Sequence, residues 1–375
     1  MTQQENNMKN PIGVAIAGLG FGESVHIPAL KENPEFELTA LWHHRNSRLK
    51  DACSKYQVKG YSDWDSLLKD SSINAIIIAT PPEPRFRLAS TALNAGKHLL
   101  LEKPVGLNSK EIIELQKIAI QKKLSVAVDF EYRAVPLFMQ TKRLIDSGFI
   151  GDPWLVKFDW LMSSRADKAR PWNWYSQAEK GGGVLGALGT HAFDMLHWFM
   201  GPTEKANGLV STSIKERIDI NSQKLLKVTS EDIALAQLEM YCVRSKLTFP
   251  AQVNLSAVTR QGRGCWIEFY GSEGTVILGS ENQKDYVHGF GLWQAKAGEQ
   301  AKSLAPAKDL KFTTSWTDGR IAPVSRLQSW WAKSIISGQP MVPGLAEGLA
   351  SQKICDQIRG SENYHKDDLY KYSLS

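Results

Sequence analysis

The sequence predicts an α/β protein in which a doubly wound parallel sheet is followed by an α+β domain with a large, mostly antiparallel open sheet. Up to about residue 130, short apolar runs alternate with helical segments of about 10–15 residues. Beyond that point, long β-like runs follow one another with few helices between them. The length of 375 residues also fits two domains of about 150 residues or more. We therefore expect domains at 10–130 and 131–375.

The predicted strands of the first domain are apolar runs bounded by turn residues. They are Ile12–Ala17, Phe36–Trp42, Ala75–Ala79, His98–Leu101 and Ser125–Val128, with helices at Ser24–Lys31, Asn46–Tyr56, Arg85–Ala95 and Asn108–Lys123. Pro81 and Pro82 end the third strand, because proline lacks an amide proton and has a fixed φ. Gly96 suits a left-handed cap after the third helix. Strands that alternate with helices build a parallel sheet through right-handed crossovers.

The second domain has a different order of predicted elements, with strands that follow one another directly. Its predicted strands are Leu155–Leu161, Ile233–Cys242, Lys246–Val258, Cys265–Tyr270 and Thr275–Leu278, and its helices are Pro136–Asp146, Thr190–Met200 and Val324–Gln357. Strands that follow one another without helices pair in an antiparallel sheet, with one face open or covered by helices. Trp330, Trp331, Ile335 and Ile336 give the last helix an apolar stripe.

Composition excludes several classes of protein. Apolar residues make up 42% and charged residues 22%, which is typical of a soluble globular chain. The net charge of +6 is spread without a basic tail, so a nucleic-acid role has no support. The apolar runs are far shorter than the roughly 20 residues of a membrane span. The first ten residues are polar and contain no secretory segment, so we expect a cytoplasmic protein.

The turn after the first predicted strand has the composition of a phosphate-binding loop. It reads Gly18-Leu-Gly20-Phe-Gly22 and lies inside a βαβ unit. Glycines there let the backbone approach a pyrophosphate, and the following helix offers unpaired N–H groups. Glu23 stands where the fingerprint usually has its third glycine, so the match is imperfect. A tight turn without a ligand is the alternative interpretation.

The end of the second predicted strand discriminates between nicotinamide cofactors. An acidic residue about 20 positions beyond the glycines usually binds the ribose 2′-hydroxyl of NAD. Here the chain reads Trp42-His43-His44-Arg45-Asn46-Ser47, without a carboxylate. Arg45 could pair with a 2′-phosphate and stack on adenine. We therefore expect NADP(H) in preference to NAD(H), although Arg45 could also be a solvated residue at a helix start.

Several further segments, in order along nearly the whole chain, resemble the glucose-fructose oxidoreductase/inositol dehydrogenase (Gfo/Idh/MocA) family. They are Gly18–Gly22 with Val25–Pro28, Ala79–Pro82, Ala95–His98 leading into Glu102-Lys103-Pro104, Tyr132-Arg133, Gly181–Gly183 through His191 and Asp194, and Gly271–Thr275. The resemblance implies an N-terminal Rossmann domain and a C-terminal α/β domain whose open sheet often forms oligomer interfaces. We accordingly expect a homodimer or homotetramer.

The resemblance also implies a catalytic set. Lys103 would lie by the nicotinamide and the reacting oxygen of the substrate, where an amine can accept or donate the hydroxyl proton. A cis peptide often precedes the proline equivalent to Pro104. His191 and Asp194 would share one helix face, with His191 as a substrate contact or auxiliary acid/base, unless it is a buried histidine bonded to the backbone. The family often has an Asp where this chain has Ala187. Three alternatives follow: the catalytic set is only Lys103 and His191, the proton path differs, or activity is absent.

The remaining site residues are inferred in two groups. For the cofactor we expect Gly18, Gly20, Phe21, Gly22, His44, Arg45, Thr80, Pro81, Glu102, Lys103 and Trp172. For the substrate we expect Tyr132, Arg133, Arg165, Trp174 and His191, since aromatic rings and guanidinium groups suit polyhydroxylated or anionic molecules. Ordinary packing would explain the same side chains. Glu131 stands where an Asn is more usual. No metal is expected, because the four cysteines form no C-x-x-C pair.

Together these features predict an NADP-dependent oxidoreductase. It would transfer a hydride between the nicotinamide and a hydroxyl or carbonyl carbon of a sugar, polyol or related small molecule. Two alternatives stay open. One is a non-catalytic, dinucleotide-sensing regulatory protein of the same fold, which Ala187 favours and the presence of Lys103 and His191 disfavours. The other is a double-bond reductase similar to the biliverdin reductases.

Overall fold

The computed structural model describes residues 11–282 and 286–360, which form two compact units. The first unit contains the chain up to Pro136 together with Lys311–Leu349, and the second contains Leu137–Leu310 and the chain from Ala350 onward. Residues 311–349 therefore belong with the N-terminal sheet, whereas the sequence pattern places them in the second domain. The polar first ten residues lie outside the described part. No helix within that part is long and apolar enough to cross a membrane.

The sheet of the first unit is parallel throughout and has six strands in the order β3-β2-β1-β4-β5-β6. The strands are β1 (Ile12–Ala17), β2 (Phe36–Trp42), β3 (Lys59–Tyr61), β4 (Ala75–Ile78), β5 (His98–Leu101) and β6 (Val126–Val128). The strand order reverses between β1 and β4, and in such sheets ligands bind at the carboxyl ends of the strands beside this switch point. Only β3 was absent from the predicted strands.

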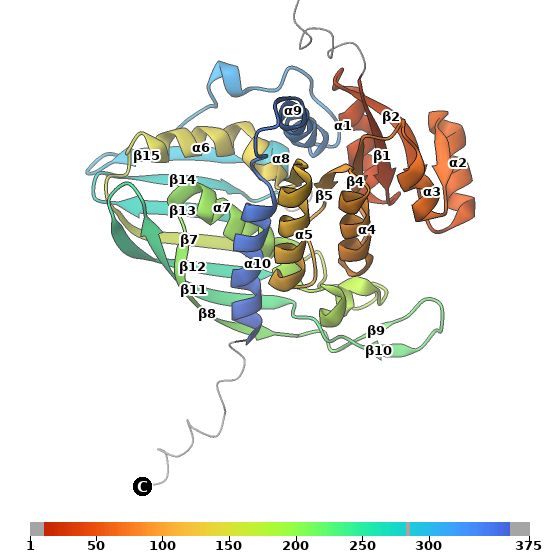
Figure 1. Ribbon diagram of the computed structural model, residues 1–375. Helices are drawn as coiled ribbons and strands as arrows, with labels where there is room; N and C mark the ends of the chain where they lie inside the picture. Colours follow the sequence, from red (N-terminus) through yellow and green to blue (C-terminus); the bar gives the residue numbers. More distant parts are fainter. Residues whose placement is uncertain (1–10, 283–285, 361–375) are drawn as a thin grey trace, which may run out of the picture. The chain divides into compact units, whose positions relative to one another are not determined.

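Helices cover both faces of this sheet (Figure 1). They are the π-helix η2 (Gly22–His26), α1 (Ile27–Lys31), α2 (Asn46–Tyr56), α3 (Trp64–Lys69), α4 (Pro82–Asn94), α5 (Ser109–Lys122) and α9 (Ile321–Ser337), with the short 3₁₀ turn η3 (Glu131–Ala134) after β6. Successive strand residues point to opposite faces. Ile76 therefore packs in one apolar cluster with Leu88, while Ile77 packs in the other with Trp331 of α9.

The second unit is built on an eight-stranded sheet in the order β16-β15-β14-β13-β7-β12-β11-β8. All neighbours are antiparallel except β7 and β12. The strands are β7 (Pro153–Leu161), β8 (Thr203–Ser211), β11 (Ile233–Cys242), β12 (Leu247–Ser256), β13 (Gly264–Gly271), β14 (Gly274–Ser280), β15 (Gly291–Lys296) and β16 (Lys302–Ser303), and a separate hairpin pairs β9 (Glu216–Ile218) with β10 (Leu225–Lys227). The sheet confirms the predicted mostly antiparallel architecture.

Helices α6 (Pro136–Asp146) and α7 (Thr190–Met200) cover one face of this sheet, where Phe199 of α7 packs edge-on against Phe269 of β13 at 5.3 Å between ring centroids. Buried and exposed side chains alternate along β11, so Leu235 points to the opposite face and is 43% exposed there. The short helical elements are η4 (Trp174–Ser176), η5 (Ala178–Lys180), η6 (Leu185–Gly189), α8 (Tyr286–Gly289) and η7 (Lys308–Leu310). One open face is thus a property of this unit.

The last predicted helix is wrong as a single element. It consists of α9 and α10 (Leu345–Gly360), separated by a segment that begins at Gly338 with φ of 68°. Pro340 and Pro343 in that segment cannot donate the amide hydrogen bonds of a continuous helix. The apolar stripe also differs, since Trp331 is fully buried but Ile336 is 61% exposed.

Candidate active site

The glycine turn after β1 has the backbone geometry of a dinucleotide loop. Gly18 has φ of 101°, and a Cβ at this position would lie 2.6 Å from the carbonyl oxygen of Ala79. A Cβ at Gly22 would lie 2.9 Å from a methyl group of Ile16, whereas one at Gly20 would meet nothing within 4 Å. These are the three roles of fingerprint glycines: a tight turn, close helix–strand packing and an uncovered backbone. The turn therefore fits a nicotinamide dinucleotide despite Glu23.

The chain after β2 presents positive groups beside this turn. Arg48 donates to the carbonyl oxygen of Leu19 at 3.1 Å, and Arg45 and His44 are exposed. His43 is buried, and its Nδ1 accepts from the Arg45 amide at 3.0 Å. Burial, reinforced by the charges of His44, Arg48 and Arg45, lowers the pKa of His43. Residues 42–49 include no acidic side chain, so an additional phosphate would meet no repulsion from this stretch.

Glu23, which stands at the third fingerprint position, has its carboxylate turned to other partners. Its Oε1 accepts from Lys55 at 2.9 Å and from the Tyr56 hydroxyl at 3.5 Å. Both partners lie on or at the end of α2. The departure from the usual glycine is therefore accommodated by a surface ion pair.

A buried arginine connects the chain after β4 with the chain after β5. Arg85 of α4 donates to the carbonyl oxygen of Glu102 at 2.6 Å, and it also donates to the carbonyl oxygens of Thr80 and Pro104. Burial lowers the pKa of this guanidinium to about 10, against the opposing charge of Glu102. The Lys103–Pro104 peptide is cis, as the family resemblance implies. Arg85 thus binds the carbonyl group of Thr80 in the loop after β4 and the two carbonyl groups on either side of Lys103 in the loop after β5.

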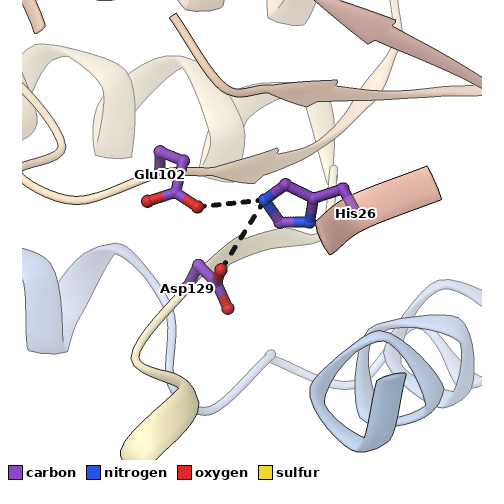
Figure 2. Close-up of side chains that lie close together, drawn as sticks. All are labelled: His26, Glu102 and Asp129. Atoms are coloured by element: carbon purple, nitrogen blue, oxygen red, sulfur yellow. Dashed lines mark hydrogen bonds and ion pairs between the residues drawn. The ribbon is translucent and has the colours of Figure 1, made fainter. Parts of the chain in front are cut away.

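Three titratable side chains from three different segments of the first unit lie close together (Figure 2). His26 Nε2 lies 3.0 Å from Glu102 Oε1 and 3.6 Å from Asp129 Oδ2. All three residues are buried: His26 at the end of η2, Glu102 directly after β5 and Asp129 directly after β6. The other oxygen of Glu102, Oε2, accepts from the backbone N–H of Lys103 at 3.2 Å.

The amide of Gln328 on α9 contacts the other side of His26. Gln328 Nε2 donates to the His26 carbonyl oxygen at 3.3 Å, and its Oε1 accepts from Asn33 at 3.4 Å. The same Nε2 lies 3.5 Å from His26 Nδ1. Because an ionised carboxylate can only accept, the hydrogen bond to Glu102 is donated by a protonated Nε2 of His26. His26, Glu102 and Asp129 have possible metal-ligand atoms within 4.8 Å of one another. A protonated Nε2 of His26, however, has no lone pair for a metal.

The carboxyl groups around Lys103 differ in their ionisation. Burial opposes the charge of Glu102, but the hydrogen bond and charge of His26 and the charge of Lys103 lower its pKa to about 2. Burial and the charges of Glu102 and Glu131 raise the pKa of Asp129 well above its ordinary value. Burial raises the pKa of Glu131 to about 7, although Lys103 acts in the opposite direction. Lys103 is thus surrounded by one ionised and two readily protonated carboxyl groups.

The structure brings the predicted first-unit residues to one edge of the sheet. Gly18 lies against the Ala79–Thr80 backbone, and Arg85 joins Thr80 to Glu102. Lys103 is partly exposed and Pro81 exposed. Tyr132 and Arg133 are only 1% and 5% exposed in η3. Their predicted substrate contacts therefore remain predictions, with little of either side chain at the surface.

Four contributors to this edge were missed in the sequence: His26, Arg85, Asp129 and Gln328. Asp129 had the same signal as Glu102, because each directly follows an apolar strand. Arg85 had a weaker one, since it falls on the helix face of the buried Leu88 and Ala89. His26 lies in the Val25–Pro28 segment of the family resemblance, but nothing there indicates its partners, and Gln328 had no signal, because these contacts join segments far apart in the chain.

The remaining predicted site residues lie in the second unit. His191 and Asp194 of α7 are 3% and 1% exposed, and the His191 ring lies 6.3 Å from that of Trp160 on β7. Ala187 lies in η6, one turn before His191. Trp172 donates from its indole nitrogen to the carbonyl oxygen of Lys227 at 3.0 Å, which ties it to the β10 strand. Trp174 begins η4 and is partly buried.

The fold and the site together define a dinucleotide-dependent oxidoreductase: a Rossmann sheet with a fitting glycine turn, and a lysine at its carboxyl edge. Residues 12–130 match the family model described as "Oxidoreductase family, NAD-binding Rossmann fold" and residues 142–366 match "Oxidoreductase family, C-terminal alpha/beta domain". The chain belongs to this Gfo/Idh/MocA oxidoreductase family.

Individual relatives agree with this assignment. An oxidoreductase of Synechocystis sp. described as uncharacterized is 40% identical over 351 residues, 93% of either chain. The levoglucosan dehydrogenase of Pseudarthrobacter phenanthrenivorans is 32% identical over 157 residues, 42% of this chain and 40% of that one. The crystal structure of an oxidoreductase domain protein from Kribbella flavida has a TM-score of 0.83 at 22% identity, covering 94% of this chain and 97% of that one.

Proposed function

We propose that the protein is an NADP(H)-dependent dehydrogenase or reductase that acts on a hydroxyl or carbonyl carbon of a sugar or polyol. The observation that carries this proposal is the position of Lys103: it directly follows Glu102 at the switch-point edge, and three carboxyl groups interact with it. The name of the levoglucosan dehydrogenase relative supports a sugar-type substrate. Bound nicotinamide would supply or accept the hydride.

The chain's own residues handle the proton. In the direction of oxidation, Lys103 Nζ accepts the hydroxyl proton, and in reduction it donates one to the carbonyl oxygen. The backbone of Lys103 is held by Glu102, which His26 and Gln328 orient in turn, and by the Arg85 bonds to the flanking carbonyls. His191 is the second proposed contact with the substrate hydroxyl, and Asp194 the residue that anchors it.

The preference for NADP(H) is supported by the charge after β2. Arg48 lies against the glycine turn, and Arg45, three residues earlier, is exposed. Burial lowers the pKa of His43, and the carboxylate of Glu23 is bound to Lys55. Arginine binds phosphate through two parallel hydrogen bonds. The 2′-phosphate of NADP is thus the part of the cofactor for which these residues are suited.

A substrate panel tests the proposed activity. The purified protein is mixed with NADP or NAD and a series of sugars and polyols, and the nicotinamide absorbance is followed. We expect turnover with at least one of them, and a fall of about 100-fold or more in Lys103→Met, with cofactor binding retained. Tight NADPH binding without any turnover would instead support the regulatory alternative, and wild-type turnover in Lys103→Met would remove the proton role of Lys103.

We also propose a cytoplasmic homodimer or homotetramer that associates through the open sheet face. Leu209 of β8 and Leu235 of β11 are paired neighbours on this face and are 63% and 43% exposed, and exposed apolar side chains of this kind are typical of a protein interface. Light scattering coupled to gel filtration gives the mass of the particle. A monomer at micromolar concentration would contradict the proposed assembly.

A further inference from the structure

A guanidinium group without an acidic partner lies in the second unit, just beyond the end of β7. Arg165 stacks over the ring of Tyr175, with its Cζ 3.9 Å from the ring centroid. Within residues 11–282 and 286–360, Arg165 forms no ion pair with a carboxylate. Burial lowers its pKa, and the positive charges of Arg170 and Arg217 lower it further. The charge is therefore partly desolvated, and no carboxylate of the described residues neutralises it.

Two more arginines belong to the same loop cluster. Arg217 donates to the carbonyl oxygens of Arg165 at 2.6 Å and of Asp167 at 2.7 Å, and Arg170 donates to that of Ser164. Arg217 therefore fixes the backbone of the loop. Arg165, whose guanidinium contacts the Tyr175 ring, and the exposed Arg170 still have N–H groups to offer.

The carboxylates near this cluster have other partners. In the same loop, Asp167 Oδ1 accepts from the backbone N–H of Ala169 at 2.9 Å. Asp232 accepts from the backbone N–H groups of Ser213 at 2.8 Å and Ile214 at 2.9 Å. Glu231 is bonded to Arg359 at 2.9 Å and to the Leu185 N–H at 3.0 Å. Neither acid is available to neutralise Arg165. A partly buried charge is costly unless it is paired, so the missing partner is expected to come from a ligand.

We propose that Arg165, assisted by Arg170, forms an oxyanion subsite, and that the substrate is a sugar or polyol bearing a carboxylate or a phosphate. The planar fork of arginine matches both groups through paired hydrogen bonds, and the Tyr175 ring holds that fork in one plane. Tyr175 also contacts the glycines that lead to His191, since its carbonyl oxygen accepts from the Gly183 N–H at 3.1 Å. This inference rests on the proposed function and narrows its substrate class.

Arg263 provides a matched control. Its guanidinium lies 4.0 Å from the centroid of the Trp266 ring, in the same stacked geometry, but its Nη1 is bonded to Glu268 at 3.0 Å. Both arginines lose an aromatic contact when changed to methionine, while only Arg165 would lose a ligand. Arg165→Lys keeps the charge and removes the planar fork.

The experiment measures both binding and turnover on the full chain saturated with NADPH or NADP. Calorimetry gives the Kd of glucuronate, glucose 6-phosphate and inorganic phosphate, and the nicotinamide absorbance gives kcat/KM for glucose, glucuronate and glucose 6-phosphate. We expect at least one anion to bind, and its affinity to fall about 10- to 100-fold in Arg165→Met. Arg263→Met should stay within about twofold of wild type, and Arg165→Lys should fall in between. The relative losses for glucuronate and the two phosphates identify which oxyanion the site takes.

The outcomes separate this inference from the proposed function. Turnover of glucose equal to that of both anionic sugars, or equal losses in Arg165→Met and Arg263→Met, would overturn the subsite while leaving the dehydrogenase standing. Anion binding that depends on Arg165 but no turnover of any sugar would keep the subsite and reject the activity. The absence of binding by all three anions would also overturn the subsite, provided that the thermal midpoint shows a folded protein.

Discussion

His26 and Glu102 form a buried hydrogen bond of 3.0 Å between segments 76 residues apart, one residue before the proposed catalytic lysine. Because an ionised carboxylate can only accept a hydrogen bond, the bond runs from His26 Nε2 to Glu102, while Gln328 contacts the other side of the histidine. Glu102 then uses its second oxygen for the N–H of Lys103. The conformation of Lys103 is thus connected to η2 and α9 through side chains that do not reach the substrate.

Glu102→Gln tests this positioning role. The amide replaces an acceptor oxygen by a donor, so one of the N–H groups of His26 or Lys103 loses its partner. We expect kcat to fall about tenfold or more with little change in KM, since misplacement of a catalytic group affects the reaction step. Glu111→Gln is the control, because Glu111 accepts only a loop N–H, that of Leu107, at 2.7 Å. Equal kcat values in the two variants would argue against positioning.

Arg45→Ala tests the cofactor preference. Loss of a guanidinium that pairs with the 2′-phosphate should raise the Kd of NADPH about tenfold or more and leave that of NADH unchanged. Lys50→Ala is a suitable comparison, since Lys50 is an exposed cation on the same helix, α2. Fluorescence titration measures each Kd. A wild-type preference for NADH, or equal NADPH binding in Arg45→Ala, would show that the prediction is wrong.

Glu131→Gln tests the effect of a buried acid on stability. The pKa of Glu131 is raised from 4.5 to about 7, chiefly by burial, so the folded protein holds its proton more tightly than the unfolded chain. Its contribution is fully present below about pH 4.5 and is lost as the pH rises through about 7. Relative to wild type, the neutral variant should gain of the order of 1–3 kcal/mol in the free energy of unfolding from about pH 5 to about pH 8. Urea titrations across this range check it, and parallel curves would contradict it.

Arg85→Met tests the buried clamp. The methionine fills much of the arginine volume but leaves the carbonyl groups of Thr80, Glu102 and Pro104 without their donor. We expect a loss of about 3–5 kcal/mol in the free energy of unfolding. Arg87→Met, an exposed position on the same helix, should change it by less than about 0.5 kcal/mol. Similar urea midpoints for the two variants would show that the clamp contributes little.

Much of the fold follows from local patterns. The bounds of β1, β2, α2, β5, α6, α7 and β11 coincide with the predicted runs, because strong apolar periodicity and turn residues act within each segment. The missed strands have weak local signals. β3 is three residues long and ends in a partly exposed Tyr61, and β8 contains charged residues and Asn207 on an open edge. Their pairing depends on neighbouring strands.

The site was less predictable than the fold. Lys103 could be identified from the sequence, because it follows the end of a strand and lies in a segment that resembles the family. His26, by contrast, follows from no local rule, since its partners come from β5, β6 and α9. The burial that changes the pKa of Asp129 and Glu131 is likewise a property of the packed unit. Sequence patterns identify which residues carry the chemistry, whereas tertiary packing determines how those residues are held and charged.

Residues 311–349 belong to the first unit although they come late in the chain, which affects how this unit folds during translation. Trp331, Leu327 and Ala332 of α9 complete one of the two apolar clusters around the Rossmann sheet, and the ribosome makes them only after nearly the whole second unit. The amino-terminal sheet therefore leaves the ribosome with one face only partly covered, by α1 and α2, until its last helix is made. A message truncated before residue 321 yields a product with an apolar surface open to chaperones and proteases.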